Sequence, residues 1–224
     1  HYLIMDQLII SKLHEIKLLI AGFLVCTFLL AMRIKVTESY TFIFLGWNIF
    51  LAFIPYVITL LLQIHKNWQR STYIWLPFAG VWLLFLPNTP YLISDLQHLR
   101  HSDPSTIWMD ALLLTTFVWY AFLIFFLTVR DMQNIIRPKI KAAYIHHLTI
   151  SVFILCGFGI YLGRFLRWNS WDIIKNPLAL LYDICIRVRH PFAYYETWMV
   201  TFGYTLITTL VFYGMLSNAK NNNS

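Results

Sequence analysis

The chain has 224 residues, of which 59% are hydrophobic, 18% aromatic and only 12% charged. A soluble domain carries about 25% charged residues, so this sequence has too few polar side chains to form a water-exposed surface, and lipid must cover much of it. The formal net charge of +7 does not indicate nucleic-acid binding, because the Lys and Arg residues lie in short segments between apolar runs, as membrane topology requires.

Several apolar runs approach the length of about 20 residues that crosses a bilayer. There are six, at residues 16–32, 41–64, 73–93, 107–129, 143–163 and 191–216. The first run lacks a small-residue cleavage site, so we expect an uncleaved span, with residues 1–15 as an interfacial helix or an extension of it. The sequence predicts an all-α polytopic membrane bundle, with residues 1–217 as a single transmembrane domain and residues 218–224 as a polar tail.

The third run is interrupted by Pro87, Asn88, Thr89 and Pro90. The two prolines remove backbone donors and break a helix. Irregular backbone at membrane depth is tolerated only where protein buries it or where it lines a wet cavity. We expect a new helix to begin at Pro90, with Thr89 as its cap, and to run to about Arg100.

Polar side chains recur along that second helix. Tyr91, Asp95 and His98 fall on one helical stripe, which presents an acid and an imidazole in one direction. Asp95, His98 and His101 also have the i, i+3 spacing of side chains that can reach one metal ion. A solvated interfacial face or a general binding site explains the same pattern, so the divalent metal stays a weak candidate and no other cofactor is predicted.

A polar and aromatic connection, residues 164–190, precedes the last run. Arg164 and Arg167 can bind carboxylate or phosphate groups, and Trp168 and Trp171 suit a sugar face or the membrane interface. Asn169 and Asp172 could fix hydroxyl groups, or Asp172 could neutralise an arginine. The alternative is an ordinary aromatic belt with snorkelling arginines.

A short helix is expected after Asn176 and Pro177, over residues 178–188. At 1.5 Å per residue it spans only about 16 Å, so it should lie along the membrane surface. Within it, Asp183 and Arg187 are expected to form a surface ion pair.

The distribution of Lys and Arg gives a preference for orientation. With six spans, nine of them fall on the side of the termini and eight on the other, and five of those eight lie in residues 164–190. Setting that segment aside favours cytoplasmic termini. In either orientation, residues 88–106 and 164–190 lie on the same membrane face, where Asp95 or His98 can meet Arg164, Arg167 or Asp172 as a clamp or as a ligand site.

Two stretches carry a family resemblance: residues 82–99, WLLFLPNTPYLISDLQHL, and residues 161–172, YLGRFLRWNSWD. In order and spacing they resemble the bacterial membrane-protein family known as domain of unknown function 1361. The resemblance implies a multi-pass protein of the bacterial cytoplasmic membrane and implies no activity. It carries over as motif positions, without roles, Asn88, Pro90, Asp95, His98, Arg164, Arg167, Asn169 and Asp172.

The leading hypothesis is a non-transporting binding or accessory protein. Its site, on the extracytoplasmic face, would recognise an anionic or hydroxylated group such as a lipid headgroup or envelope precursor. Arg164 and Arg167 would be the anion donors. The complete set of predicted binding residues is Arg164, Arg167, Asn169, Trp168, Trp171, Asn88 and Tyr91.

Two alternatives stay open. One is an intramembrane hydrolase or transferase that acts on a lipid-linked substrate, with Asp95, His98 and Asp172 as catalytic candidates. If this enzyme depends on a metal, the candidate metal ligands are Asp95, His98 and His101. The other is a structural subunit of a membrane complex. The expected partners are membrane lipids and, for the structural alternative, another membrane protein; nucleic acid is not expected. Each hypothesis requires a different arrangement of these side chains. An enzyme requires Asp95 and His98 to lie at a shared metal ion or water molecule. A binding protein requires the arginines to face a cavity, and a structural role requires them to be saturated by carboxylates.

Overall fold

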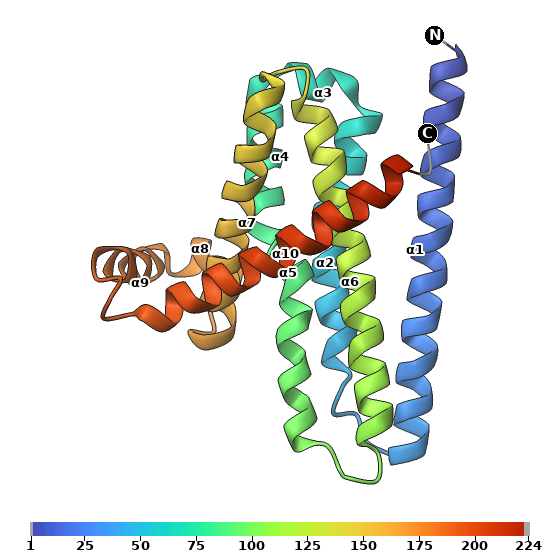
Figure 1. The fold of residues 1–224 in the computed structure, drawn as a ribbon, viewed down its shortest axis with the longest axis vertical. Coiled ribbons are helices and arrows are strands. Elements are labelled where there is room, and N and C mark those ends of the chain that lie inside the picture. The colour runs from blue at the N-terminus through green and yellow to red at the C-terminus, as the bar shows by residue number, and fades with distance from the viewer. Residues whose placement is uncertain (1, 222–224) are drawn as a thin grey trace.

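The computed structural model describes residues 2–221 of the protein, and the side chains of residues 12–217. Every regular element in this part of the chain is helical, which confirms the predicted all-α fold (Figure 1). The elements are α1 (Tyr2–Thr37), α2 (Phe44–Ile64), α3 (Lys66–Arg70), α4 (Thr72–Phe85), α5 (Asn88–Tyr91), the 3₁₀ helix η1 (Leu92–His101), α6 (Ile107–Ile136), α7 (Ala142–Phe165), α8 (Asp172–Lys175), α9 (Pro177–Arg189) and α10 (Tyr195–Asn221).

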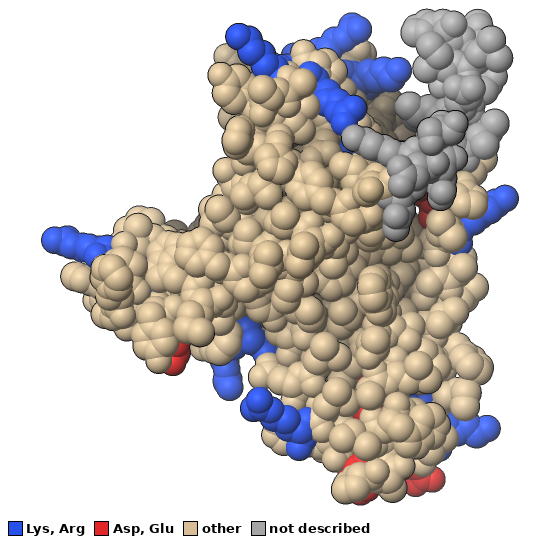
Figure 2. Space-filling view, in the orientation of Figure 1, with Lys and Arg blue, Asp and Glu red and all other residues tan. Residues whose placement is uncertain are grey.

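Six helical segments among the described residues are long and apolar enough to cross a membrane. They are Lys12–Thr37, Phe44–Ile64, Thr72–His101, Ile107–Ile136, Ala142–Phe165 and Tyr195–Ser217. Charged side chains gather at the upper and lower ends of the molecule and around α9, and the broad surface between them carries few (Figure 2). The protein is therefore a multi-pass membrane protein. Residues 2–15 continue the first helix rather than forming a separate interfacial one.

Helix α6 is the centre of the bundle. It packs against α1, α2, α5, η1, α7 and α10. Most of its apolar side chains are buried, for example Leu114, Ile124 and Phe125, whereas Trp108 and Trp119 are exposed. A helix with so many buried apolar positions belongs inside a fold rather than at its edge.

Helix α1 packs against α6 between Lys12 and Arg33. Gly22 allows this approach, because a Cβ atom there would lie 2.6 Å from the ring of Tyr120. The Tyr120 hydroxyl donates a 2.6 Å hydrogen bond to the carbonyl of Leu19. Nearer the other end of α1, Nε of Arg33 pairs with Oδ1 of the fully buried Asp110 at 3.0 Å.

The third span is broken as predicted, but its second half begins earlier and has a different geometry. Helix α4 ends at Phe85, and α5 starts at Asn88 rather than at Pro90. The Thr89 hydroxyl donates to the carbonyl of Leu86 at 2.7 Å instead of capping a helix. The chain then continues as a 3₁₀ helix with about three residues per turn, so residues three apart share one face.

Helices α7 and α10 cross in close contact on one side of the bundle (Figure 1). A Cβ atom at Gly157 would overlap the backbone carbonyl of Thr201, so only glycine permits this crossing. One at Gly159 would lie 2.9 Å from Pro87, which places the proline break of the third span against α7. The predicted short helix is present as α9, which projects from the bundle between α7 and α10 (Figure 1).

Candidate functional site

A buried ion pair joins η1 to the end of α7. Nη1 of Arg164 lies 3.2 Å from Oδ1 of Asp95, a residue that is only 1% exposed. The other carboxylate oxygen accepts a 2.8 Å hydrogen bond from Nδ2 of Asn48 on α2. The guanidinium also donates to the Tyr91 hydroxyl at 3.3 Å and to the carbonyl of Ser94 at 3.1 Å. Both charges are thus compensated inside the protein, as a stable buried pair requires.

His98 reaches this pair through the arginine. Its Nε2 atom is 4.0 Å from Oδ1 of Asp95 but 3.4 Å from Nη2 of Arg164. His101, the next residue in the i, i+3 series, is exposed. In the described part of the chain, no three His, Cys, Asp or Glu side chains lie together in a way that could hold a metal ion. Asp95 and His98 are therefore brought together around a guanidinium group.

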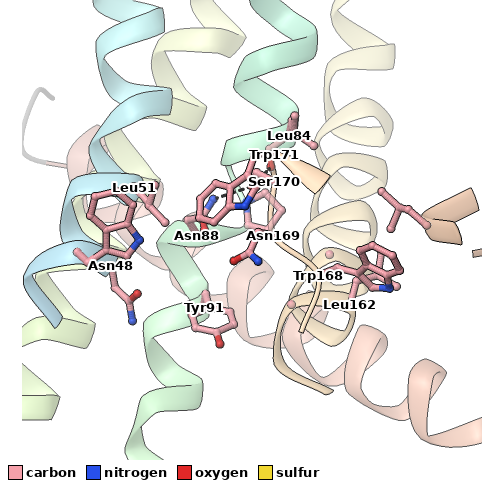
Figure 3. A pocket seen from close by; sticks show the side chains of 15 residues that line it. Asn48, Leu51, Leu84, Asn88, Tyr91, Leu162, Trp168, Asn169, Ser170 and Trp171 are labelled. Atoms are coloured by element: carbon pink, nitrogen blue, oxygen red, sulfur yellow. Dashed lines mark hydrogen bonds between the residues drawn. The ribbon is translucent and has the colours of Figure 1, made fainter. Parts of the chain in front are cut away.

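A pocket of about 200 Å³ lies beside the ion pair (Figure 3). Its walls come from α2, α4, α5, α7, α9 and the connection that follows α7. The lining residues are Trp47, Asn48, Leu51, Leu84, Pro87, Asn88, Tyr91, Gly159, Leu162, Gly163, Trp168, Asn169, Ser170, Trp171 and Leu180. They include three tryptophan rings and three asparagine amides, and none of these lining residues is charged.

Each of the three asparagines uses at least one N–H group within the protein. Nδ2 of Asn48 donates to Asp95, Nδ2 of Asn169 donates to Asp172 at 3.2 Å, and Nδ2 of Asn88 donates to the Phe85 carbonyl at 2.9 Å. These neighbours are acceptors, so they fix the orientation of each amide. Among the described residues, no donor reaches the Oδ1 atom of any of the three. The lining therefore contains free amide oxygens as acceptors, together with the indole N–H donors of Trp47 and Trp171.

The connection after α7 reaches the pocket through a left-handed turn. Arg167 has a φ angle of 61°, which is uncommon for a residue with a side chain. The turn allows the backbone N–H of Trp168 to donate to the carbonyl of Leu162 at 3.1 Å. Oδ2 of Asp172 then accepts the backbone N–H of Asn169 at 2.7 Å as well as its side-chain amide. The carboxylate of Asp172 thus orients Asn169.

Five of the predicted binding residues line the pocket: Asn88, Tyr91, Trp168, Asn169 and Trp171. The others lie around it. Arg164 points to Asp95, and this contact confirms the expected meeting of the two polar segments. Arg167 is exposed on the connecting turn, and Asp172 supports Asn169 from outside. His101 lines a different pocket, which it shares with Asp110.

Sequence reasoning missed several residues of this site. Trp47 and Asn48 lie on α2 inside an apolar run, and a lone amide within a span was a signal that could have been used. Ser170, in the segment between Trp168 and Trp171, was not among the predicted site residues. Its hydroxyl donates to the carbonyl of Leu84 at 3.2 Å and accepts a hydrogen bond from Asn88 at 3.4 Å. These bonds join the connection to the end of α4.

Asp183 and Arg187 form the predicted ion pair in α9, but the prediction that the pair lies on the surface is wrong for Arg187. Arg187 is 7% exposed and bonds to Oδ1 of Asp183 at 2.9 Å. The other carboxylate oxygen of Asp183 accepts the indole N–H of Trp168 at 2.8 Å. Arg187 is buried because α9 folds back toward α7, where the guanidinium lies over the rings of Tyr161 and Tyr194, whereas the side chain of Asp183 is 28% exposed. The effect of the pair is to orient a tryptophan of the pocket.

The comparisons agree with the sequence motifs. No curated protein and no solved structure matches the chain significantly. A family described as protein of unknown function, DUF1361, matches residues 47–211, about three quarters of the 224 residues. This range contains every residue that lines the pocket and both partners of the Asp95–Arg164 pair. The chain, a multi-pass helical membrane protein, belongs to the DUF1361 family.

Proposed function

We propose that the protein is a membrane-embedded binding or accessory protein whose pocket takes a hydroxylated group. The observation that carries this proposal is the convergence of three tryptophan and three asparagine side chains on one pocket without a charged side chain. Tryptophan rings stack on the apolar faces of sugars and similar groups. Amide oxygens accept hydrogen bonds from hydroxyls, so the two kinds of side chain together suit a polyhydroxylated group.

The uncharged lining of the pocket favours a hydroxylated ligand over an anionic one. Arg164, one of the two expected anion donors, is committed to Asp95 and the groups around it. An anion in the pocket would lie beside the amide oxygens of Asn48, Asn88 and Asn169 without a cationic side chain in the lining to compensate it, and such desolvation is costly. A hydroxyl group donates to the same atoms and loses little.

The apolar part of the wall favours a ligand attached to lipid. Leu51, Leu84, Leu162 and Leu180 contribute to the same lining as the asparagines. A glycerol or sugar headgroup would place its hydroxyls on the amides and its hydrocarbon along these leucines. Arg167, exposed on the adjoining turn, would remain available for a phosphate linked to that headgroup. An envelope precursor on the extracytoplasmic face has this chemistry.

The geometry gives less support to a metal-dependent hydrolase. Asp95 and His98 both contact the guanidinium of Arg164, and His98 lines a different pocket from the one beside the ion pair. A purely structural role explains the saturated Arg164. It does not explain a pocket of about 200 Å³ beside it that is lined with tryptophan and asparagine side chains.

Native mass spectrometry in a mild detergent tests the proposal. Wild type, Trp171→Ala and Trp119→Ala are compared after reconstitution with a neutral glycosyl diacylglycerol or with phosphatidylcholine of the same chains. Trp119 is 64% exposed on α6 and does not line the pocket, so it is the matched control. We expect wild type and Trp119→Ala to retain the glycolipid and Trp171→Ala to lose it.

Equal retention of the glycolipid by all three proteins would contradict the proposal, as would retention of phosphatidylcholine in preference to it. The second result would identify the pocket as an ammonium site, since tryptophan faces and amide oxygens also suit a cation. Bare protein in every sample would favour the structural role.

A further inference from the structure

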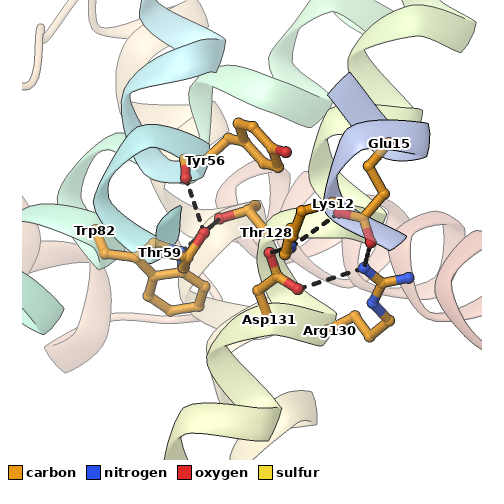
Figure 4. A network of polar contacts seen from close by, with 8 residues as sticks. All are labelled: Lys12, Glu15, Tyr56, Thr59, Trp82, Thr128, Arg130 and Asp131. Atoms are coloured by element: carbon orange, nitrogen blue, oxygen red, sulfur yellow. Dashed lines mark hydrogen bonds and ion pairs between the residues drawn. The ribbon is translucent and has the colours of Figure 1, made fainter. Parts of the chain in front are cut away.

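A second polar region lies between α1 and α6, near the end of the bundle that carries α3. Two cations and two carboxylates alternate there (Figure 4). Nζ of Lys12 lies 2.9 Å from Glu15 and also contacts Asp131. Nη2 of Arg130 contacts Glu15 and lies 3.3 Å from Asp131. Each carboxylate therefore meets both cations, and this charged network is neutral as a whole.

The surface around the charged network is strongly basic. The two connections at this end, residues 65–71 and 137–141, contain Lys66, Arg70, Arg137, Lys139 and Lys141, and neither contains an acidic residue. Lys and Arg stand out at the upper end of the molecule (Figure 2). The carboxylates of Glu15 and Asp131 are already consumed by Lys12 and Arg130, so they do not compensate these cations. An excess of Lys and Arg marks the cytoplasmic side of a membrane protein.

A pocket of about 440 Å³ opens between the charged network and this basic surface. Its lining is polar at all positions but one: Lys12, Glu15, Gln63, Lys66, Gln69, Arg130, Asp131, Asn134 and Ile135. Lys66 makes no ion pair with any described side chain and is exposed. Both ion pairs of Arg130 use Nη2, so its other N–H groups are left for a ligand. The site thus presents cationic donors that the protein does not satisfy.

The pocket also holds one acceptor that needs a donor. Oε1 of Gln63 is buried and has no hydrogen-bond partner within the described structure. A buried acceptor without a partner costs about 1–3 kcal/mol. A rotation of the Gln63 amide that turns this oxygen toward the pocket would let a ligand hydroxyl satisfy it. The preferred ligand therefore combines a negative charge for Lys66 and Arg130 with a hydroxyl group for Gln63.

We propose that this pocket binds a phosphodiester headgroup that carries hydroxyls, such as the phosphoglycerol group of an anionic lipid. Basic pockets between spanning helices on the cytoplasmic side are typical sites for anionic headgroups. The site is separate from the pocket beside the Asp95–Arg164 pair. Asn48 lines that pocket and Gln63 lines this one, and the two residues are 15 positions apart on α2, about 22 Å along a helix. It stands whether or not the proposed function is correct.

The test compares Lys66→Gln with Lys141→Gln. Both remove one exposed lysine from the same end of the molecule, but only Lys66 lines the pocket. Native mass spectrometry from nanodiscs of mixed phosphatidylglycerol and phosphatidylcholine measures the fraction of protein that keeps one phosphatidylglycerol. We expect wild type and Lys141→Gln to keep it, and Lys66→Gln to bind it about tenfold more weakly, the size of a lost charged hydrogen bond.

Two further measurements test whether the phosphate group belongs to a lipid or to a soluble ester, and whether Gln63 recognises the glycerol hydroxyls. Soluble glycerol phosphate that displaces the lipid, and whose binding depends on Lys66, would assign the pocket to a free phosphate ester rather than to a lipid; both results support the phosphate site. Gln63→Leu should reduce the preference for phosphatidylglycerol over phosphatidic acid, which lacks the glycerol hydroxyls. Equal weakening by Lys66→Gln and Lys141→Gln would overturn the proposal, because it indicates diffuse surface charge, and so would equal retention of phosphatidylcholine.

Discussion

The Asp95–Arg164 pair and the charged network between α1 and α6 compensate buried charge in different ways. In the first, one carboxylate and one guanidinium are completed by neutral partners such as Asn48 and Tyr91. In the second, two carboxylates and two cations satisfy one another.

The difference matters for the pocket beside each region. The amide of Asn48, which completes Asp95, also lines a pocket without charged walls, which suits a hydroxylated ligand. The charged network uses up both carboxylates at a basic end of the bundle, so its pocket retains the excess positive charge and suits an anion. The neighbours that complete an ion pair, rather than the pair itself, thus determine what can bind next to it.

The largest effect is expected from breaking the first region. Asp95→Ala leaves the guanidinium of Arg164 largely buried without its carboxylate, which costs about 3–5 kcal/mol. Thermal unfolding in mild detergent should show a much lower midpoint and a low yield of folded protein. Asp103→Ala, which removes an exposed carboxylate, is the control and should change little. Similar midpoints for the two variants would show that the pair does not hold η1 to α7.

A smaller effect is expected from breaking the second region. Asp131→Ala removes two charged contacts, but Lys12 and Arg130 keep Glu15 as a partner and border a polar pocket. We expect a loss of about 1.5–3 kcal/mol, measured by the same unfolding experiment. The exposed Glu196→Ala is the matched control. A loss as large as that of Asp95→Ala would mean that the four charges do not substitute for one another.

Gly157→Ala should destabilise the part of the bundle that contains the Asp95–Arg164 pair and leave the charged network between α1 and α6 unchanged. The added methyl group overlaps the Thr201 carbonyl and pushes apart α7, which carries Arg164, and α10. Overpacking of this kind costs about 1–3 kcal/mol. Gly203→Ala, on α10 with open space around it, should be neutral or slightly stabilising. Hydrogen exchange should increase in α7 and α10 but not at the contact of α1 with α6, and a uniform increase would contradict the separation.

The smallest effect is expected from Asn169→Ala. It removes one acceptor from the pocket and leaves the Asp95–Arg164 pair intact, so the unfolding midpoint should stay within the range of the controls. Affinity for the glycosyl lipid should fall by about tenfold or less, as for one neutral hydrogen bond. A titration followed by tryptophan fluorescence measures this change. Unchanged affinity would remove Asn169 from the proposed site.

Much of the architecture was predictable because the amino-acid composition of each segment indicates whether that segment spans the membrane. Apolar runs of sufficient length predicted the six spans. Counting spans then placed residues 88–106 and 164–190 on one face, and this parity argument anticipated the contact of Asp95 with Arg164. The polar motifs were also visible, because Trp168, Asn169 and Trp171 lie close together in the chain.

The remaining parts of the site depend on contacts between distant segments. Glu15 and Arg130 are 115 residues apart, and the sequence showed them only as unrelated charges at the ends of apolar runs. Asn48 has no polar neighbour in the chain, and its role arises only when α2 packs against η1. The direction in which Arg164 points was equally open, since an anion or a carboxylate of the protein could satisfy it.

The helical class, the spans, the family motifs and the membrane face they share follow from the sequence, because burial in lipid constrains each segment separately. Tertiary packing sets three further features: the third span continues as a 3₁₀ helix, Arg164 pairs with Asp95, and three asparagines from separate segments line one pocket. The physical reason is that a guanidinium or an amide can satisfy its hydrogen bonds in several ways. Packing selects one of them, and that selection decides which atoms are left for a ligand.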